Sequence, residues 1–159
     1  MSKKVIAVIP AYNAGDNLIN LADQLKQQTF DDVYILNDVS TDTSIEAIRE
    51  SHPSYIVIDG EKNVGPAGNR NRILDMISDE LIVFIDADMV LEPGDMRRHV
   101  EDVMRNERIG MAGGYILNKQ HYPMGWNYGF EMNPKKDAWF SQVCNVIGRQ
   151  DITDVYRAD

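Results

Sequence analysis

Short runs of apolar residues recur at intervals of about 20–30 residues along most of the chain. Many of these residues are β-branched, and polar or turn-forming residues bound each run. Runs of this length indicate strands, and runs without polar alternation are expected where helices cover both faces of a sheet. The predicted strands are residues 5–9, 33–36, 55–58, 81–85 and 111–117.

Between these runs, the apolar residues follow the spacing of amphipathic helices. Pro66 and Pro93 lie near the starts of the third and fourth patterns, where a helix tolerates proline. Strands that alternate with helices predict βαβ units with right-handed crossovers. The expected fold is therefore α/β, with a mostly parallel sheet and flanking helices. The apolar faces are Leu18, Leu21, Ala22 and Leu25; Ile45 and Ile48; Ile73, Leu74 and Ile77; and Met96, Val100, Val103 and Met104.

Residues 118–159 lack this periodicity and hold more than half of the aromatic side chains. Long segments of this kind are usually functional or mobile. We therefore expect an α/β region over residues 1–117 and a loop-rich region over residues 118–159. Because no closing element precedes Asp159, the C-terminal part is expected to be incomplete.

Composition and charge narrow the possible classes. With 159 residues, 43% hydrophobic and 26% charged, the sequence is typical of one ordered domain. Its longest apolar runs are far shorter than the ~20 residues that span a bilayer, so no membrane segment is expected. Cys144 is the single cysteine, which favours a reducing, cytoplasmic location. The net charge of −9 argues against nucleic acid as the main partner.

Polar residues follow the first four predicted strands, at residues 10–13, 37–42, 63–72 and 86–88. In open α/β sheets, ligands bind beyond the carboxyl ends of the strands. Four polar segments at that edge therefore predict one binding site, although each segment alone is a weak signal.

Asp86 and Asp88 follow a buried run, and side chains at i and i+2 share a face in extended structure. Two nearby carboxylates repel each other unless a cation lies close, and hard oxygen ligands suit Mg²⁺ or Mn²⁺, which also bind phosphate. The alternative is a solvated pair or a cap of the next loop. The position beside the other polar segments favours the metal site.

The remaining candidates each have a structural alternative. Asp38 is placed to accept a ring N–H of a nucleobase, or it forms a turn before the next helix. Asn13 belongs to a ligand-binding turn or caps a helix. Arg70 and Arg72 suit phosphate, but they cannot face one way on a helix, so at least one is expected in a surface salt bridge. The histidines show no ligand spacing and are expected at the surface or in loops: His52, His99 and His121.

Taken in order, these segments resemble the donor-binding half of a family 2 glycosyltransferase of the GT-A fold, over residues 4–117. The family's strand-end P-x-Y-N is matched by Pro10, Tyr12 and Asn13, and its Q-T-F before the second strand is matched by Gln28, Thr29 and Phe30. Its D-D-G-S-T-D corresponds to residues 37–42, and its N-x-G-x-x-x-x-R-N corresponds to Asn63, Gly65, Arg70 and Asn71. Its D-x-D with a downstream proline is matched by Asp86, Asp88 and Pro93. Two positions depart from the pattern, since Asn37 replaces the first aspartate and Val39 replaces glycine. Valine resists the positive φ that glycine accepts.

The resemblance implies a nucleotide-diphosphate sugar as the donor, with a UDP-sugar favoured, and Mn²⁺ or Mg²⁺ as the cofactor. It implies that Asp88 is the more direct metal ligand and that Asp86 approaches ribose or metal. The implied donor-binding residues are Pro10, Ala11, Tyr12, Asn13 and Asp38 for the base, Arg70 and Asn71 near ribose and diphosphate, and Asn63, Gly65, Asp86, Ala87 and Asp88 around them.

The family's catalytic base, often in a Glu-Asp pair, lies beyond the D-x-D. After Asp88 the only such pair is Glu101-Asp102, which falls inside the fourth predicted helix. Asp151 and Asp154 are the late acids that remain as candidates. Residues 155–158 resemble the strand that leads into the segment holding the base.

The resulting hypothesis is a metal-assisted, inverting glycosyltransferase with an unknown acceptor. One alternative is a catalytically incomplete nucleotide-sugar-binding fragment. A lower alternative is a phosphohydrolase of the haloacid dehalogenase type, whose D-x-D follows a strand near the N-terminus, whereas Asp86 comes late here. A dinucleotide-dependent dehydrogenase is disfavoured because no G-x-G-x-x-G follows the first predicted strand. The oligomeric state stays open.

Overall fold

The computed structural model describes residues 4–77, 81–91, 96–105, 111–112 and 146–147. Several predictions lie outside these residues. They concern Pro93, the side chain of His99, His121, Cys144, Asp151, Asp154, residues 113–117 of the fifth predicted strand and the strand-like residues 155–158.

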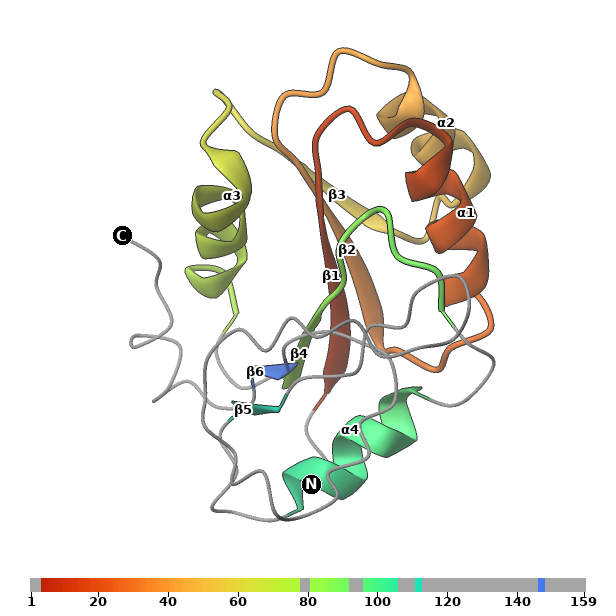
Figure 1. Ribbon diagram of the computed structural model, residues 1–159, viewed down its shortest axis with the longest axis vertical. Helices are drawn as coiled ribbons and strands as arrows, with labels where there is room; N and C mark the ends of the chain where they lie inside the picture. The colour runs from red at the N-terminus through yellow and green to blue at the C-terminus, as the bar shows by residue number, and fades with distance from the viewer. Residues whose placement is uncertain (1–3, 78–80, 92–95, 106–110, 113–145, 148–159) are drawn as a thin grey trace, which may run out of the picture.

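Four parallel strands form the centre of the sheet, and helices connect them (Figure 1). Within the described part of the chain, the strand order is β3-β2-β1-β4-β6-β5, and β6 runs antiparallel to both β4 and β5. The elements in chain order are β1 (Val5–Ala11), α1 (Gly15–Leu25), β2 (Asp32–Asn37), α2 (Ser44–Ser51), β3 (Ile56–Asp59), α3 (Gly65–Leu74), β4 (Leu81–Phe84), α4 (Met96–Met104), β5 (Met111–Ala112) and β6 (Val146–Ile147).

The register brings the carboxyl ends of the parallel strands to one edge. Ala11 at the end of β1 pairs with Asn37 at the end of β2, and Asn37 pairs with Asp59 at the end of β3. On the other side of β1, Val8 pairs with Phe84 at the end of β4. The polar segments that follow these strands therefore begin side by side.

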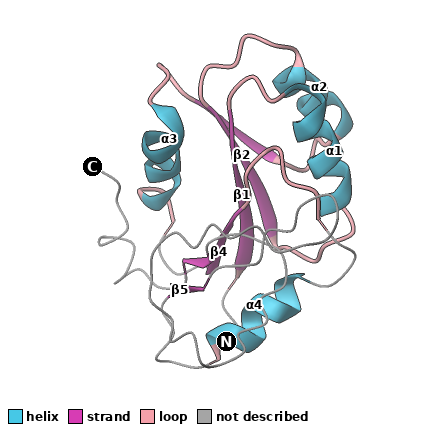
Figure 2. Ribbon diagram, in the orientation of Figure 1, coloured by secondary structure: helices cyan, strands magenta, loops and turns pink. Residues whose placement is uncertain are grey.

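Helices cover both faces of the sheet. Figures 1 and 2 show α1 and α2 on one face and α3 on the other. Along β1 the side chains alternate accordingly, with Ala7 and Ile9 in the apolar cluster under α1 and α2, and Ile6 and Val8 in the cluster under α3. This two-sided burial explains why the strands read as continuous apolar runs.

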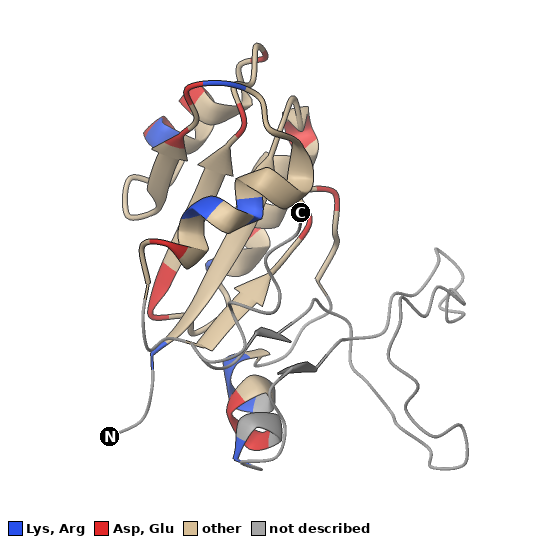
Figure 3. Cartoon of the chain, turned by 90° about the vertical axis from the view of Figure 1, so that its left-hand side faces the viewer, with Lys and Arg blue, Asp and Glu red and all other residues tan. Residues whose placement is uncertain are grey.

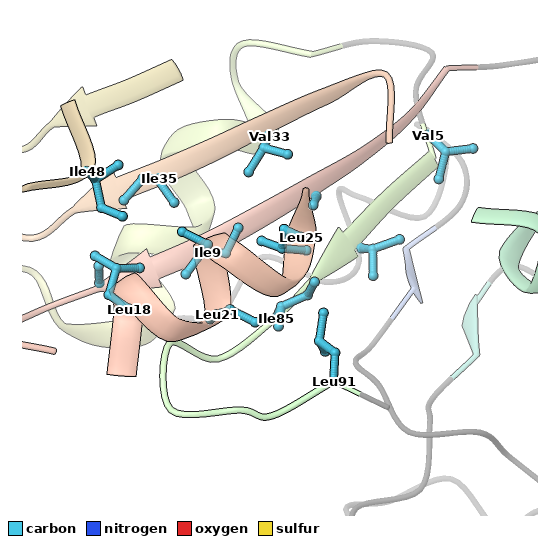
Figure 4. Packing of buried hydrophobic residues seen from close by; sticks show 14 of the residues in the cluster. Val5, Ile9, Leu18, Leu21, Leu25, Val33, Ile35, Ile48, Ile85 and Leu91 are labelled. Atoms are coloured by element: carbon cyan, nitrogen blue, oxygen red, sulfur yellow. The ribbon is translucent and has the colours of Figure 1, made fainter. Parts of the chain in front are cut away.

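The larger cluster joins α1 and α2 to the sheet (Figure 4). Leu18, Leu21 and Leu25 of α1 are fully or almost fully buried against it, at 0–2% exposure. Their spacing follows the helical repeat, and packing of this apolar face on the sheet supplies most of the stability of so short a helix. Leu91 and Val100, from the chain after β4, complete the same cluster.

The expected α/β fold with a mostly parallel sheet is confirmed, and the first four predicted strands form within one or two residues of their expected bounds. The structure adds β6, which the sequence did not predict because two residues without flanking periodicity give no strand signal. The division at residue 117 stays a prediction. Within the described chain, no helix combines the length and apolar character needed to span a membrane.

Candidate functional site

The loops after β1 and β2 are hydrogen-bonded to each other at the sheet edge. The Asp38 amide donates to the Ala11 carbonyl at 2.9 Å, and the Asn13 amide donates to Ser40 Oγ at 3.1 Å. In return, Asn13 Oδ1 accepts the Thr41 amide at 2.7 Å. The two loops therefore act as one unit that leaves Tyr12 exposed at 55%.

The alternative in which Asn13 caps α1 is wrong. Helix α1 begins at Gly15, and the side chain of Asn13 is turned toward the loop after β2. The Gly15 amide instead donates to Asp42 Oδ2 at 2.9 Å. The Ser44 hydroxyl donates to the other oxygen of Asp42 and, with the Gly15 and Ser44 amides, holds the pKa of that carboxyl below its usual range.

Asp38 is buried at 2% exposure, and its carboxylate is directed toward the start of α3. Oδ1 accepts the Val64 amide at 3.0 Å, and Oδ2 accepts the Gly65 amide at 2.9 Å. Arg72 Nη2 lies 3.2 Å from Oδ1. A carboxylate at the N-terminus of a helix satisfies amides that have no partner within the helix. These contacts occupy the Asp38 oxygens that were expected to accept a ring N–H of a nucleobase.

Arg72 ties three segments together. Its guanidinium donates to the Asn37 carbonyl, to Asn69 Oδ1 at 2.9 Å and to the Lys62 carbonyl at 2.8 Å, in addition to pairing with Asp38. Because its partner Asp38 is buried, this pair is not the surface salt bridge expected for at least one of the two arginines; the pair of Arg70 with exposed Asp86 is. The sequence marks Arg72 only as a candidate for phosphate, because no local pattern reveals contacts across 34 residues.

Asn69 was also missed. It is buried at 1% exposure, and its amide nitrogen donates to the Leu36 carbonyl of β2 at 2.7 Å. A buried polar side chain in the middle of a helix face is the signal that would have found it, since such groups are nearly always hydrogen-bonded.

Arg70 lies on the opposite side of α3 and faces the end of β4. Its Nη2 pairs with Asp86 Oδ1, its Nη1 donates to the Pro66 carbonyl at 3.2 Å, and its guanidinium carbon lies 5.9 Å from the centre of the Phe84 ring. Figure 3 shows the basic part of α3 lying over the sheet, with acidic segments nearby. The buried Nε of Arg70 has no hydrogen-bond partner among the described residues.

Asp86 and Asp88 are both exposed after β4, but the backbone between them is not extended. The Met89 amide donates to the Asp86 carbonyl at 3.0 Å, which closes a turn over Ala87 and Asp88. The extended-chain reason for expecting the two carboxylates on one face is therefore wrong. Both side chains still reach solvent, while Ala87 and Met89 pack against the larger apolar cluster.

The other predicted donor-binding residues lie around this edge. Pro10 is in β1, Ala11 ends that strand, and Asn63 is exposed before α3, where its side chain donates to the Asp38 carbonyl at 3.2 Å. Gly65 opens α3 at a φ of 74°, a conformation that glycine adopts easily. Asn71 is half-buried on α3.

His52 directly follows α2 in the loop toward β3, which agrees with the expected surface or loop position, but its side chain is buried. Its side chain is 1% exposed, Nδ1 lies 2.7 Å from Ser51 Oγ, and its ring packs on Tyr55 with the ring centres 4.9 Å apart. Burial is the main cause that lowers the pKa of His52, ahead of the nearby Lys26 charge. This residue belongs to the packing of α2 rather than to the strand-end edge.

The donor set at the end of β4 fits a hard divalent cation that is completed by a ligand. No group of three or more acidic, histidine or cysteine side chains able to hold a metal exists in the described part of the chain. Asp86 and Asp88 supply carboxylate oxygens, and Mg²⁺ is commonly held through one or two carboxylates plus substrate phosphates. The edge thus combines an exposed aromatic ring, an arginine and two carboxylates.

The sequence matches Glycosyl transferase family 2 over residues 6–158. The chain belongs to this family. The poly(ribitol-phosphate) beta-glucosyltransferase of Bacillus spizizenii is 31% identical over 160 residues, which cover 94% of this chain and 25% of that protein. Family membership sets aside the phosphohydrolase alternative.

Solved structures show the same fold. Staphylococcus aureus TarS 1-349 superposes with a TM-score of 0.68 at 18% identity, covering 96% of this chain and 49% of that one. TarS 1-349 in complex with UDP-GlcNAc gives 0.53 at 24% identity, with 64% and 30% covered. The mannosyltransferase PcManGT of Pyrobaculum calidifontis, in complex with GDP-Man and Mn²⁺, gives 0.62 at 20% identity, with 74% and 36% covered. These are GT-A fold glycosyltransferases.

The chain spans about a quarter to a third of the length of the curated relatives that it matches. It therefore corresponds to a part of each of these relatives.

Proposed function

We propose that the chain binds a nucleotide-diphosphate sugar at the carboxyl ends of β1, β2, β3 and β4 and takes part in the transfer of its sugar to an acceptor. The observation that carries the proposal is the exposed pair Asp86 and Asp88, set directly after buried β4 and beside Arg70. Family membership and the nucleotide-sugar complexes of TarS and PcManGT support it.

The base would lie over the joined loops after β1 and β2, where Tyr12 is exposed. A UDP-sugar is the donor we favour, and the structure of TarS with UDP-GlcNAc supports a uracil base, whereas that of PcManGT with GDP-Man keeps guanine open. Because the Asp38 oxygens are occupied by α3 and Arg72, Asp38 would act on the base by fixing the loops rather than by accepting its ring N–H.

Asp88 would hold Mn²⁺ or Mg²⁺, and Asp86 would contact ribose or the same ion. When bound, the ion neutralises the negative charge that builds on the diphosphate leaving group, which is worth several kcal/mol. Arg70 lies beside these carboxylates, and a guanidinium forms strong hydrogen bonds with diphosphate oxygens. Its present partner Asp86 would keep it turned toward the site before the donor arrives.

An inverting transfer needs a carboxylate that removes the proton of the acceptor hydroxyl. Asp151 and Asp154 remain the candidates within the chain. The second candidate function is nucleotide-sugar binding without transfer, because the described residues supply the donor edge and both candidates for the catalytic base lie outside them. The cytoplasm remains the proposed location.

Calorimetric titration of the chain with UDP in the presence of Mn²⁺ tests the proposal. We expect metal-dependent binding that Asp88→Asn abolishes and that Asp102→Asn, an exposed aspartate on α4, leaves intact. Equal binding by the chain and by Asp88→Asn would exclude the metal assignment. Release of UDP from a UDP-sugar, measured with this chain and with a longer version of it, separates transfer from binding alone.

A further inference from the structure

Val39 has a backbone conformation that its side chain disfavours. Its φ is 65°, in the left-handed region, and the only other described residue besides glycine with a positive φ is Asn13. Asparagine tolerates this region, but a β-branched residue there is a real outlier, because its Cβ crowds the following carbonyl. Position 39 is also where the sequence replaces a glycine of the family pattern.

Packing does not explain the valine. Val39 is 37% exposed, and neither apolar cluster of the described structure includes it. The turn itself is held by its neighbours, since Asn37 Oδ1 accepts the Ser40 amide at 2.8 Å and the Asp38 amide donates to Ala11. Glycine would make the same turn without strain. Strained residues of this kind cluster at active sites and ligand-binding sites.

Val39 belongs to the loop after β2, which is hydrogen-bonded to the loop that carries Tyr12. The hydrogen bonds from Asp38 to Ala11 and from Asn13 to Ser40 join the residues on either side of this pair. Tyr12 and Val39 are therefore at matching positions in two bonded loops, and both are exposed. Their exposed side chains, an aromatic ring and an isopropyl group, are the apolar surface that the joined loops offer, whereas the neighbouring side chain of Asp38 is buried.

We infer that Val39, together with Tyr12, contacts the nucleobase of the donor. This contact is the reason why a strained valine occupies a position where glycine would fold more easily. The inference rests on the proposed function. The carboxylate of Asp38 already accepts the Val64 and Gly65 amides and pairs with Arg72. Apolar contact with the flat face of the base is therefore the interaction that this surface offers.

The test compares the chain with Val39→Gly and Val39→Asn, which relieve the strain and so are expected to fold. We expect Val39→Asn to raise the melting temperature by about 2–4 °C. We expect Val39→Gly to weaken UDP binding in Mn²⁺ by about 5–20-fold, because the contact of its isopropyl group is lost. Binding of Mn²⁺-pyrophosphate, which has no base, should not change in either variant.

Ile56→Thr is the matched control, because Ile56 is 39% exposed at the start of β3, the opposite end of the sheet. Unchanged UDP affinity in Val39→Gly would overturn the inference. So would a parallel loss of UDP and pyrophosphate affinity, since Val39 would then act through the loop and not on the base. If the wild-type chain binds neither UDP nor GDP, the proposed function fails as well; if it binds and Val39→Gly binds equally, only this inference fails.

Discussion

The guanidinium of Arg72 lies against Gly60, so close that a methyl group at position 60 would stand 2.3 Å from both of its terminal nitrogens. Gly60 follows β3, and its amide donates to the Asn37 carbonyl at 2.8 Å. Arg72 reaches the ends of β2 and β3 from α3 through this gap. The absence of a side chain at Gly60 thus allows the contact between Arg72 and Asp38.

We predict that Gly60→Ala destabilises the chain by about 1–3 kcal/mol, the usual cost of overpacking. The guanidinium is fixed by several hydrogen bonds, so it cannot move aside without breaking its bonds to Asp38 and Asn69. Urea denaturation of the chain and of the variant measures the change.

A double-mutant cycle with Arg72→Met provides the control. If the steric contact is the cause, Gly60→Ala costs little in the Arg72→Met background, and the two effects do not add. Additive costs would show that Gly60 acts independently of Arg72.

The sequence predicts the sheet better than it predicts the site. Strand and helix positions follow from apolar periodicity, and Pro66 correctly marks the first turn of α3. The position of Asp86 and Asp88 at the end of a strand also follows from the apolar periodicity. What periodicity cannot supply is the partner of each polar group, and so the direction of the Asp38 carboxylate and the turn at Asp88 were not predictable.

Val39 shows the same limit. The sequence indicates that valine replaces glycine in a turn, but it cannot tell whether the turn changes or the valine is strained. The structure keeps the turn at a φ of 65°. The loop is held on both sides, because the Asn13 and Asp38 amides donate hydrogen bonds and Asn37 Oδ1 accepts one from the Ser40 amide.

Arg70→Gln is predicted to separate metal binding from nucleotide binding. The guanidinium pairs with Asp86, so its removal takes away a positive charge beside the carboxylates. We expect Mn²⁺ alone to bind about 3–10-fold more tightly and Mn²⁺-UDP to bind more weakly, since Arg70 no longer faces the diphosphate. Titration of Mn²⁺ by electron paramagnetic resonance, with and without UDP, measures both.

Arg49→Gln is the comparison for this experiment. Arg49 forms an exposed ion pair with Asp59 at 2.5 Å, on α2 and away from β4. Unchanged Mn²⁺ affinity in Arg70→Gln would show that the Asp86 pair does not compete with the ion.

As the pH falls, the chain is predicted to lose stability through protonation of His52 before its aspartate side chains are protonated. Burial lowers the pKa of His52 below 6.5, so at pH values near and below 6.5 the unfolded chain binds more protons than the folded chain. Stability from this residue is present above pH 6.5 and is lost as the pH falls. The pKa values of Asp23, Asp31 and Asp42 are also lowered, but from a usual value of 3.8, so these residues reduce the free energy of unfolding only at more acidic pH.

Denaturation at pH 7.5 and pH 5.5, each by urea, measures the loss, and His52→Gln is expected to reduce it. An equal loss in the variant would assign the pH dependence to other groups.

Gln24 and Gln28 are predicted to position the segment that carries Asp88. Gln24 Oε1 accepts the Leu91 amide, and Gln28 Oε1 accepts the Met96 amide at the start of α4, at 3.0 Å. Gln24→Met, which keeps the size of the side chain, should destabilise the chain by about 1–2 kcal/mol and weaken Mn²⁺-UDP binding severalfold. Gln24→Glu should retain both properties, since a carboxylate also accepts the amide proton. Gln27 lies exposed between the two glutamines, so Gln27→Met should change neither stability nor affinity, and equal affinities of the two methionine variants would refute the positioning role.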